Sequence, residues 1–191
     1  IGITGTNGKT TISNLVADMA DHYGLDFAHN AYGSNIEEGI ITSLIEASSF
    51  FGKRRKKLAF LEIDERLTRV IFPDISPDYL IVSNLFRESY LRNAHAEFIY
   101  SVLKDNIPAR TKLILNADDM LSYNLAEGHE SVSFSIARLA GEPQFTRNLI
   151  RDVVLCPSCH RPLEDDFIRY HHIGRAHCSN CSWQNGPADY E

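Results

Sequence analysis

The sequence has few cysteines, no long hydrophobic run and no excess of positive charge. All four cysteines of its 191 residues lie between positions 156 and 181. No apolar run approaches the roughly 20 residues that a membrane-spanning helix requires. The net charge is −6, which argues against a general nucleic-acid-binding protein because such proteins carry a basic surface. Hydrophobic residues make up 43% of the chain, enough for the core of one ordinary domain with a small appendage.

A glycine-rich stretch near the start of the chain has the pattern of a phosphate-binding loop. Residues 4–11 are Thr-Gly-Thr-Asn-Gly-Lys-Thr-Thr, after a short apolar run and before an amphipathic segment with apolar residues at helical spacing: Ile12, Leu15, Val16, Met19 and Ala20. Glycines let backbone N–H groups turn toward a polyphosphate, and a helix N-terminus adds unpaired N–H groups and a positive dipole end. Lys9 can reach the β- and γ-phosphates, and Thr10 can hold Mg²⁺. The general P-loop pattern places glycine at position 3, where this sequence has Ile3. The departure indicates a particular subclass of phosphate-binding loop rather than the general one.

Apolar and helical segments alternate along the rest of the chain. The patterns predict helices at 10–23, 36–51 and 94–105, and strands at 26–29, 58–63, 78–84, 111–115 and 131–135. We expect the second helix to bury four aliphatic residues: Ile40, Ile41, Leu44 and Ile45. Residues 30–35 are predicted as a turn-rich loop and 136–151 as a connector. The alternation predicts an α/β fold, a doubly wound and mainly parallel sheet.

Polar side chains follow several predicted strands. Glu62 ends the strand at 58–63, and Asp64 and Glu65 come next. Ligands bind at the carboxyl edge of such sheets, so Glu62 is a candidate Mg²⁺ ligand, whereas Asp64 and Glu65 better suit a helix N-terminus. Asn84 and the run Asn-Ala-Asp-Asp at 116–119 also stand at strand ends.

Five consecutive basic residues occupy positions 53–57, Lys-Arg-Arg-Lys-Lys. The simpler interpretation is a solvated loop between a helix and a strand. The alternative is attraction to anionic lipid head groups, which requires a membrane-attached substrate.

The cysteines form two Cys-x-x-Cys pairs, Cys156 with Cys159 and Cys178 with Cys181, with residues 160–177 between them. This spacing is typical of a four-cysteine structural zinc site, whose complete ligand shell leaves no position for catalysis. We predict a zinc ribbon, with a lead-in strand at 153–155 and a hairpin of 167–170 with 174–177. The nearby histidines are expected to be exposed or packed rather than ligands: His160, His171, His172 and His177. A redox function of the cysteine pairs is the other interpretation.

These motifs, in this order, resemble the MurT family, the Mur ligase-like subunits of lipid II isoglutaminyl synthase. The resemblance rests on the loop at 5–11, Gly-Ser-Asn at 33–35, Glu-Ile-Asp-Glu at 62–65, Asn-Leu-Phe-Arg at 84–87, 116–119 and the cysteine module. It covers essentially the whole chain. It implies the central ATP-binding domain of a Mur ligase over 1–150, an inserted zinc ribbon over 151–186, and the start of a return to the central domain at 187–191.

The resemblance also implies a reaction. ATP would phosphorylate the α-carboxylate of D-glutamate in the stem peptide of lipid II, and ammonia from a GatD-type glutamine amidotransferase would then form the amide. The implied cofactors are ATP, Mg²⁺ and Zn²⁺. The implied place of action is the cytoplasmic face of the membrane, and no nucleic acid is expected as a partner. Matched residue by residue, the resemblance implies a set of nucleotide-binding residues: Gly5, Thr6, Asn7, Gly8, Lys9, Thr10, Thr11 and Asn84. It implies Lys9 and Glu62 as catalytic residues, and Thr10 and Glu62 as magnesium ligands. The four cysteines match the zinc ligands.

One segment departs from the family pattern. Where the family continues Asp-Gln-Leu-Asp-Arg-Tyr, residues 88–93 are Glu-Ser-Tyr-Leu-Arg-Asn. Leu91 therefore replaces the second aspartate of the family pattern. Related Mur ligases carry a histidine near the metal in this region, and Ser89 stands there. The alternatives are therefore another Mur-type or folylpolyglutamate-type ligase, a non-enzymatic nucleotide- and zinc-binding module, or a P-loop NTPase that couples hydrolysis to movement. We expect the chain to be part of a longer protein, whose adenine-binding segment and C-terminal domain lie elsewhere, and to be inactive by itself.

Overall fold

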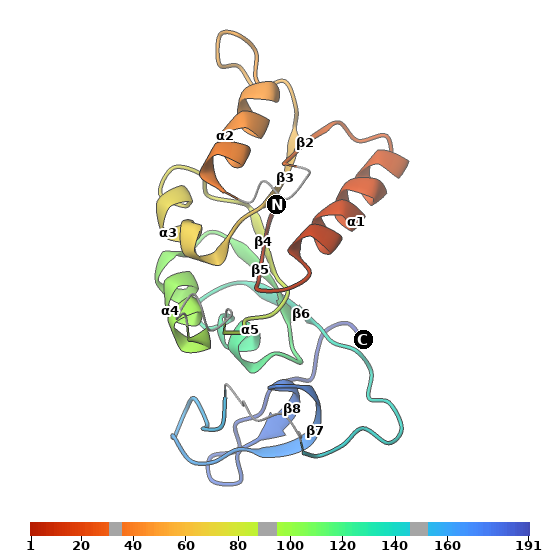
Figure 1. Cartoon of the computed structure of the whole chain (residues 1–191), viewed down its shortest axis with the longest axis vertical. Helices are drawn as coiled ribbons and strands as arrows, with labels where there is room; N and C mark the ends of the chain where they lie inside the picture. The colour runs from red at the N-terminus through yellow and green to blue at the C-terminus, as the bar shows by residue number, and fades with distance from the viewer. Residues whose placement is uncertain (31–35, 88–94, 146–152) are drawn as a thin grey trace.

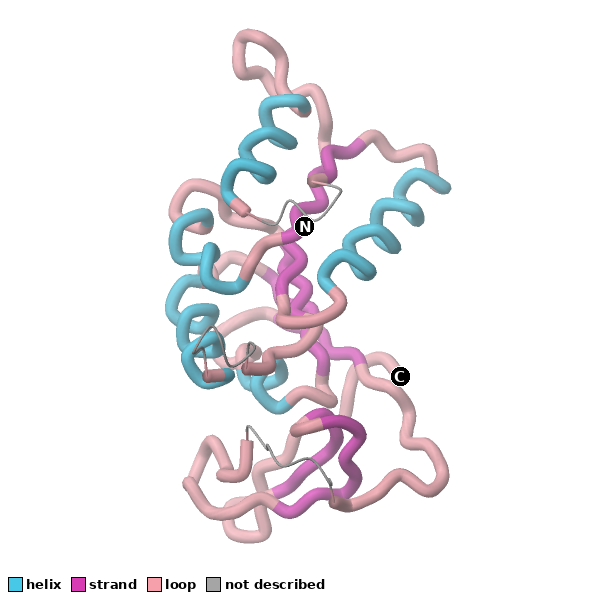
Figure 2. The backbone as a smooth tube through the Cα atoms, viewed as in Figure 1, coloured by secondary structure: helices cyan, strands magenta, loops and turns pink. Residues whose placement is uncertain are grey.

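The computed structural model describes residues 1–30, 36–87, 95–145 and 153–191 (Figures 1 and 2). Six parallel strands form one sheet in the order β2-β3-β1-β4-β5-β6. Their bounds are β1 Gly2–Thr4, β2 Phe27–His29, β3 Leu58–Glu62, β4 Tyr79–Val82, β5 Lys112–Asn116 and β6 Ser131–Phe134. Strand β1 has β3 on one side and β4 on the other, so the chain reverses its winding direction there. Ligands bind at such a switch point, and the glycine-rich loop follows β1 directly.

Helices cover both faces of the sheet, which confirms the doubly wound fold (Figure 1). Helix α1 lies on one face; α2, α3, α4 and α5 lie on the other. Their bounds are α1 Lys9–His22, α2 Glu37–Glu46, α3 Thr68–Ile71, α4 Ala96–Asn106 and α5 Met120–Asn124, with a 3₁₀ helix, η1, at Glu65–Leu67. Within the described residues no helix is both long and apolar enough to cross a membrane.

The buried helix faces are narrower than the hydrophobic pattern predicts. In α1 the buried residues include Ala17 and Ala20, while Leu15 and Met19 are exposed. In α2, Ile40 is buried and Leu44 partly buried, but Ile41 and Ile45 are exposed, and the helix ends at Glu46 rather than 51. Periodicity identifies the apolar side of a helix, whereas the width of its contact depends on the sheet beneath it. Small alanines bring α1 close to the strands, while Leu15 and Met19 remain outside.

The cysteine module forms a separate small unit below the sheet (Figure 1). Its antiparallel hairpin consists of β7 Glu164–Tyr170 and β8 Ile173–His177, with Tyr170 opposite Ile173 at the turn. The predicted hairpin is therefore confirmed. The predicted strand at 153–155 is wrong: there is only an isolated bridge between Leu155 and Pro162, and Val154 and Leu155 are exposed.

After the hairpin the chain returns to the large sheet. Tyr190 forms a parallel bridge with Phe134 of β6, and the side chain of Asp189 accepts hydrogen bonds from the backbone N–H (2.7 Å) and the hydroxyl (2.9 Å) of Ser133. These contacts agree with a return to the central domain. The boundaries at 150 and 186 remain predictions.

Candidate active site and metal centre

The glycine-rich loop lies directly against the chain that leaves β4. Gly5 has φ 127°, and a Cβ there would lie 2.1 Å from Oγ of Ser83 and 2.9 Å from the carbonyl oxygen of Asn84. Gly8 precedes α1 with φ 82° and caps it without a side chain. Because α1 begins at Lys9, the backbone N–H groups of its first turn have no partner inside the helix. The loop therefore presents N–H donors and the positive end of α1 to solvent at the carboxyl edge of the sheet, an arrangement that suits an anion.

Lys9, the predicted phosphate-binding residue, is held within the loop. Its Nζ donates to the carbonyl oxygen of Gly5 (2.6 Å) and lies 3.3 Å from Oε1 of Glu65. The side chain of Lys9 is 12% exposed and that of Glu65 is 3% exposed. Burial raises the pKa of Glu65, and the charge of Lys9 opposes this. The pair places the ammonium group at the mouth of the loop.

The predicted placement of Asp64 and Glu65 at a helix N-terminus is confirmed, because Asp64 directly precedes η1 and Glu65 is its first residue. The side chain of Asp64 accepts a hydrogen bond from the backbone N–H of Arg66 and caps η1. Glu65 instead turns inward to Lys9, across 56 positions of sequence. No local pattern reveals such a contact. The only indication of this contact in the sequence is that Glu65 is an acid soon after β3, the strand that neighbours the glycine-rich loop.

Thr10 and Glu62, the predicted magnesium ligands, lie together. The hydroxyl of Thr10 donates to Oε1 of Glu62 over 3.2 Å. Glu62 is buried at the end of β3, and the side chain of Asn30 holds its backbone through two hydrogen bonds of 2.8 Å, one to each peptide group. A hydroxyl and a carboxylate beside a phosphate loop are donors of the kind that Mg²⁺ takes. The two oxygens fit that ion, whose binding here remains a prediction.

His29, which the sequence patterns did not single out, lies beside this pair. Its Nε2 is 2.7 Å from Oγ of Ser13 in α1. Burial lowers the pKa of His29, while the carboxylate of Glu62 opposes that shift. The only indication in the sequence was its position at the end of β2, whose carboxyl end shares the edge of the sheet with β3.

Asn84, predicted to contact the nucleotide, holds the loop in place. Its Oδ1 accepts from the backbone N–H of Asn7 and its Nδ2 donates to the carbonyl oxygen of the same residue, both over 3.0 Å. Thr6 is fixed similarly, because its backbone N–H donates to the carbonyl oxygen of Asn84 (2.7 Å). Asn84 is thus a positioning residue for the loop, and direct contact with a nucleotide remains a prediction. The residues at 31–35 and 88–94, including Ser89 and Leu91, lie outside the described residues.

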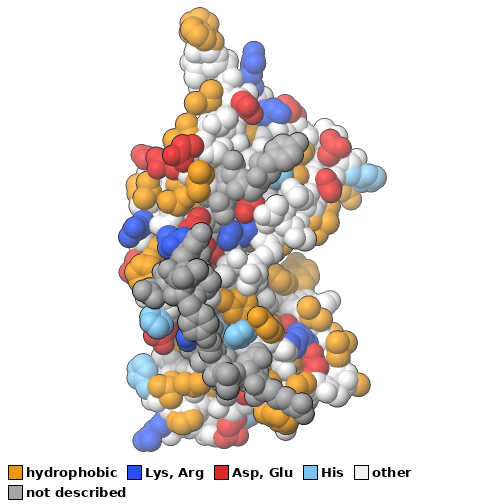
Figure 3. All heavy atoms as spheres, in the orientation of Figure 1, with side chains coloured by type: hydrophobic (Ala, Val, Ile, Leu, Met, Phe, Trp, Pro, Cys, Tyr) orange, Lys and Arg blue, Asp and Glu red, His pale blue; other side chains and the backbone are white. Residues whose placement is uncertain are grey.

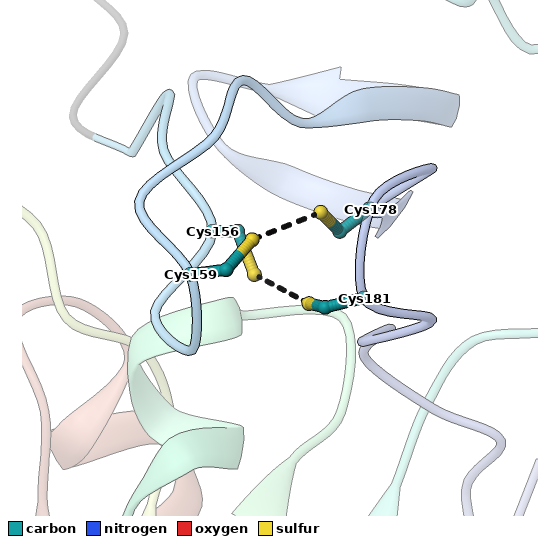
Figure 4. A group of neighbouring side chains, drawn as sticks. All are labelled: Cys156, Cys159, Cys178 and Cys181. Carbon is teal, nitrogen blue, oxygen red and sulfur yellow. Dashed lines mark hydrogen bonds between the residues drawn. The ribbon is translucent and has the colours of Figure 1, made fainter.

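The four cysteines converge from two loops (Figure 4). Their sulfur atoms lie within 4.8 Å of one another, with 3.5 Å between Cys156 and Cys181 and between Cys159 and Cys178. A disulfide requires a distance of about 2.05 Å between its sulfur atoms, so all four cysteines are free thiols in this structure. Four ligands at about 2.3 Å from a tetrahedral Zn²⁺ lie about 3.8 Å apart. The cluster is therefore compatible with zinc.

The two cysteine loops share one geometry. The backbone N–H four residues after the first cysteine donates to that cysteine's carbonyl oxygen in both loops, from His160 (2.9 Å) and from Ser182 (3.1 Å). Both residues have positive φ, 58° and 60°. The same turn therefore recurs in both cysteine loops although their sequences differ.

The crowded thiols have opposed pKa shifts. The backbone N–H of Arg161 does most to lower the pKa of Cys159, to about 6. The backbone N–H of Trp183 lowers that of Cys181, but the neighbouring thiols, Cys159 first, raise it to about 12. Thiolates so close together repel, and a divalent cation relieves that repulsion.

The ribbon histidines have roles outside the cysteine cluster. His160 is exposed, and His177 pairs with Asp166 (3.0 Å). His172 is fully buried, with Nε2 3.1 Å from Oδ1 of Asp119. The cluster found in the described part of the chain consists of cysteines alone, as the sequence predicts.

A buried polar contact docks the ribbon onto the carboxyl edge of the sheet. Asp119 caps α5 by accepting from the N–H groups of Leu121 (2.9 Å) and Ser122 (3.3 Å), and it also accepts from the N–H of Leu85 (2.5 Å). His172 of the hairpin turn completes its shell. Next to it, Nη1 of Arg169 lies 2.5 Å from Oδ2 of Asp118.

Phe86 links the ribbon to the phosphate loop. Its ring contacts those of Tyr170, His171 and His172, with centroid distances of 5.6, 5.6 and 4.9 Å. Its backbone N–H donates to Oγ1 of Thr6 (2.9 Å), and that hydroxyl donates to its carbonyl oxygen (3.2 Å). One residue therefore touches both the ribbon and the glycine-rich loop.

We predict that Asp119→Ala destabilises the chain by about 3 kcal/mol. The substitution removes the cap of α5 and two further buried hydrogen bonds, one with the backbone N–H of Leu85 and one with His172. Urea denaturation of the variant measures this loss. Glu127→Ala is the control: within the described part of the chain the side chain of Glu127 makes an exposed ion pair with Lys104 alone, so a change below about 0.5 kcal/mol is expected. Equal stability of the two variants would contradict the docking role of Asp119.

Solved structures define the class of fold. A pseudomurein peptide ligase type C from Methanothermus fervidus matches 98% of this chain with 36% of its own length, at a TM-score of 0.70 and 22% identity. MurF from Acinetobacter baumannii matches 71% of this chain with 30% of its own, at a TM-score of 0.55 and 15% identity. No protein-family model matches the chain. The chain has the fold of the Mur ligases.

Sequence comparison is more specific within that class. The chain is homologous to MurT: the Staphylococcus aureus (strain COL) protein named lipid II isoglutaminyl synthase (glutamine-hydrolyzing) subunit MurT is 30% identical to it over 190 residues. The match covers 99% of this chain and 42% of that relative. The chain thus spans less than half the length of the relative.

Proposed function

We propose that this chain is the nucleotide-binding part of an ATP-dependent ligase subunit that activates a carboxylate of a peptidoglycan precursor. The observation that carries the proposal is the joint placement of Lys9, Thr10 and Glu62 at the N-terminus of α1, on the carboxyl edge of a parallel sheet. The resemblance to Mur ligases supports ATP and Mg²⁺ as the ligands of this edge.

Each group has a distinct task in the proposed reaction. The N–H groups of the loop and the ammonium of Lys9 would bind and orient the phosphates, and the dipole of α1 adds to this. Thr10 and Glu62 would hold Mg²⁺, which when bound neutralises charge on the transferring phosphoryl group. Asn84 and Asn30 fix the loop and Glu62, so the donors are positioned before the nucleotide arrives.

The ribbon has a structural task in this proposal. Zn²⁺ held by the four cysteines would fix the hairpin, whose turn presents His172 to Asp119 and Tyr170 to Phe86. A four-thiolate shell has no open position for substrate. The metal therefore acts on the phosphate loop only through packing.

The proposed substrate is the α-carboxylate of D-glutamate in lipid II. Phosphorylation by ATP forms an acyl phosphate, and ammonia then displaces phosphate to give the amide. The proposed source of ammonia is a GatD-type glutamine amidotransferase subunit at the cytoplasmic side of the membrane. The homology to MurT supports this choice of substrate and partner.

A second candidate is another Mur-type or folylpolyglutamate-type ligase with a different acceptor. The observation that favours it is the sequence at Ser89 and Leu91, where the family pattern has other residues.

The test is a reaction of the full-length protein, with its amidotransferase partner, on lipid II, ATP and glutamine. We expect lipid II with one carboxylate converted to an amide, detected by mass spectrometry. Omission of glutamine, with ammonium salt added in its place, should restore product if the ligase subunit performs the amidation. No product from lipid II, but product from another carboxylate acceptor, would favour the second candidate.

A further inference from the structure

The segment between α2 and β3 is a built loop with a defined shape. Ser48 and Arg54 form an antiparallel bridge, and the N–H of Ser49 donates to the carbonyl oxygen of Lys53 (2.8 Å). The N–H of Gly52 donates to the carbonyl oxygen of Ser49 (2.8 Å), and its φ of 71° closes the turn. We call residues 49–57 the aromatic-basic loop. It protrudes from the end of the molecule beyond α2 (Figure 1).

The tip of this loop carries two aromatic side chains in solvent. Phe50 is 98% exposed and Phe51 is 86% exposed, with their rings edge to face at a centroid distance of 5.5 Å. A shallow groove next to Phe50 is lined by the exposed Ile41 and Ile45 of α2. Contiguous apolar surface at a protruding tip marks an interaction site rather than random exposure.

Basic side chains surround this apolar tip. Lys53, Arg54, Arg55 and Lys57 are exposed, and Lys56 anchors the loop by donating to the carbonyl oxygen of Phe27 (2.7 Å). The chain as a whole has a net charge of −6, so the loop is a local patch of opposite sign. Figure 3 shows hydrophobic side chains at this end of the molecule with basic ones close to them.

We propose that the aromatic-basic loop docks the protein on a bilayer that contains anionic phospholipid. Aromatic rings beside clustered lysines and arginines suit this surface: rings enter the boundary between head groups and acyl chains, and cations approach the phosphates. Single-stranded nucleic acid also binds aromatic and basic groups, but through open ring faces on which bases stack. A long polyanion would run past the tip over a chain whose net charge is −6, whereas a bilayer meets only the protruding basic tip, which favours the lipid.

The docking surface is separate from the nucleotide site. The loop leads into the start of β3, whereas the glycine-rich loop follows the end of β1, and these strands are parallel neighbours. The two loops therefore lie at opposite edges of the sheet. Docking leaves the nucleotide edge uncovered, and its test does not depend on the proposed ligase activity.

The test is co-sedimentation of the full-length protein with vesicles of phosphatidylcholine, alone or mixed with phosphatidylglycerol. We expect binding to the mixed vesicles that decreases as salt is added, and little binding to phosphatidylcholine alone. The triple variant Lys53→Gln/Arg54→Gln/Arg55→Gln should bind the mixed vesicles about a hundredfold more weakly. The double variant Phe50→Ser/Phe51→Ser should bind the mixed vesicles at least about tenfold more weakly than the unaltered protein does.

Matched controls separate this loop from general surface effects. Lys104→Gln/Lys112→Gln removes exposed lysines elsewhere, and Phe145→Ser removes another exposed phenylalanine. Both should bind as the unaltered protein does, and all variants should keep their melting temperatures. Binding that is absent, equal on both vesicles, or unchanged in the loop variants would overturn the proposal. Competition by single-stranded RNA that displaces the protein from vesicles through this loop would also overturn it in favour of nucleic acid.

Discussion

Lys9→Ala in the full-length protein is expected to lower ATP turnover about a thousandfold, because it removes the positive charge that meets the transferring phosphoryl group. The variant should still fold, although with lower stability, because the Nζ of Lys9 contacts only the loop and Glu65 among the partners found for it in the described chain. A phosphate-release assay at saturating ATP measures the loss. Circular dichroism verifies the fold.

The stability of the Lys9→Ala variant should depend on pH through the carboxyl group of Glu65. Burial already raises the pKa of Glu65 from 4.5, and loss of Lys9 removes the charge that opposes this shift. The folded state then holds a proton that the unfolded state releases. Its stabilising effect is complete below the unfolded pKa and is lost as pH rises through the folded one, so Lys9→Ala should lose stability as the pH rises above 4.5.

Two further variants separate catalysis from stability. Lys9→Ala/Glu65→Gln removes the unpaired carboxylate, so it should recover stability at neutral pH but remain as inactive as Lys9→Ala. Lys104→Ala, at an exposed lysine of α4, should retain full turnover. If Lys9→Ala kept wild-type turnover, the phosphate-binding assignment of residues 4–11 would be wrong.

Removal of zinc is expected to unfold the ribbon. The hydrophobic cluster around the cysteines is small: Met120 of α5 packs with Cys156, Leu163, Ala176 and Cys178 of the ribbon, and the partly buried Trp183 packs against them. Units of about 40 residues need a metal, disulfides or a partner to fold, and structural zinc contributes an apparent 10 kcal/mol or more. Trp183 is the only tryptophan of the chain, so its fluorescence reports on this region. A strong chelator should shift its emission to longer wavelength.

Two neighbouring substitutions make the zinc prediction specific. Cys178→Ala should abolish the one bound zinc per chain and reproduce the emission shift. Ser179→Ala alters the exposed next residue, whose hydroxyl donates to Glu164 and to no other of the described residues, and it should retain zinc and emission. Metal analysis and fluorescence measure both. Native emission in metal-free Cys178→Ala would show that the ribbon folds without zinc.

Local patterns predicted most of the sheet and both candidate sites. The strands at 58–63, 78–84 and 111–115 are predicted because each is a short apolar run between turn residues, and the strand at 131–135 because polar and apolar residues alternate there. The loop at 4–11 and the cysteine pairs were identified because phosphate binding and metal binding need certain residues a few positions apart. The placement of Thr10 against Glu62 follows as well, since neighbouring parallel strands end at one edge.

Contacts between distant segments depended on tertiary structure. The sequence by itself determined the parallel α/β class, the glycine-rich loop and the four-cysteine cluster, each of which arises from residues close in the chain. Only the folded structure paired Glu65 with Lys9, buried His172 against Asp119, turned Asn84 onto the loop and left Phe50 and Phe51 in solvent. The reason is physical: spacing along the chain determines local geometry, but the partner and burial of a side chain depend on how the elements pack.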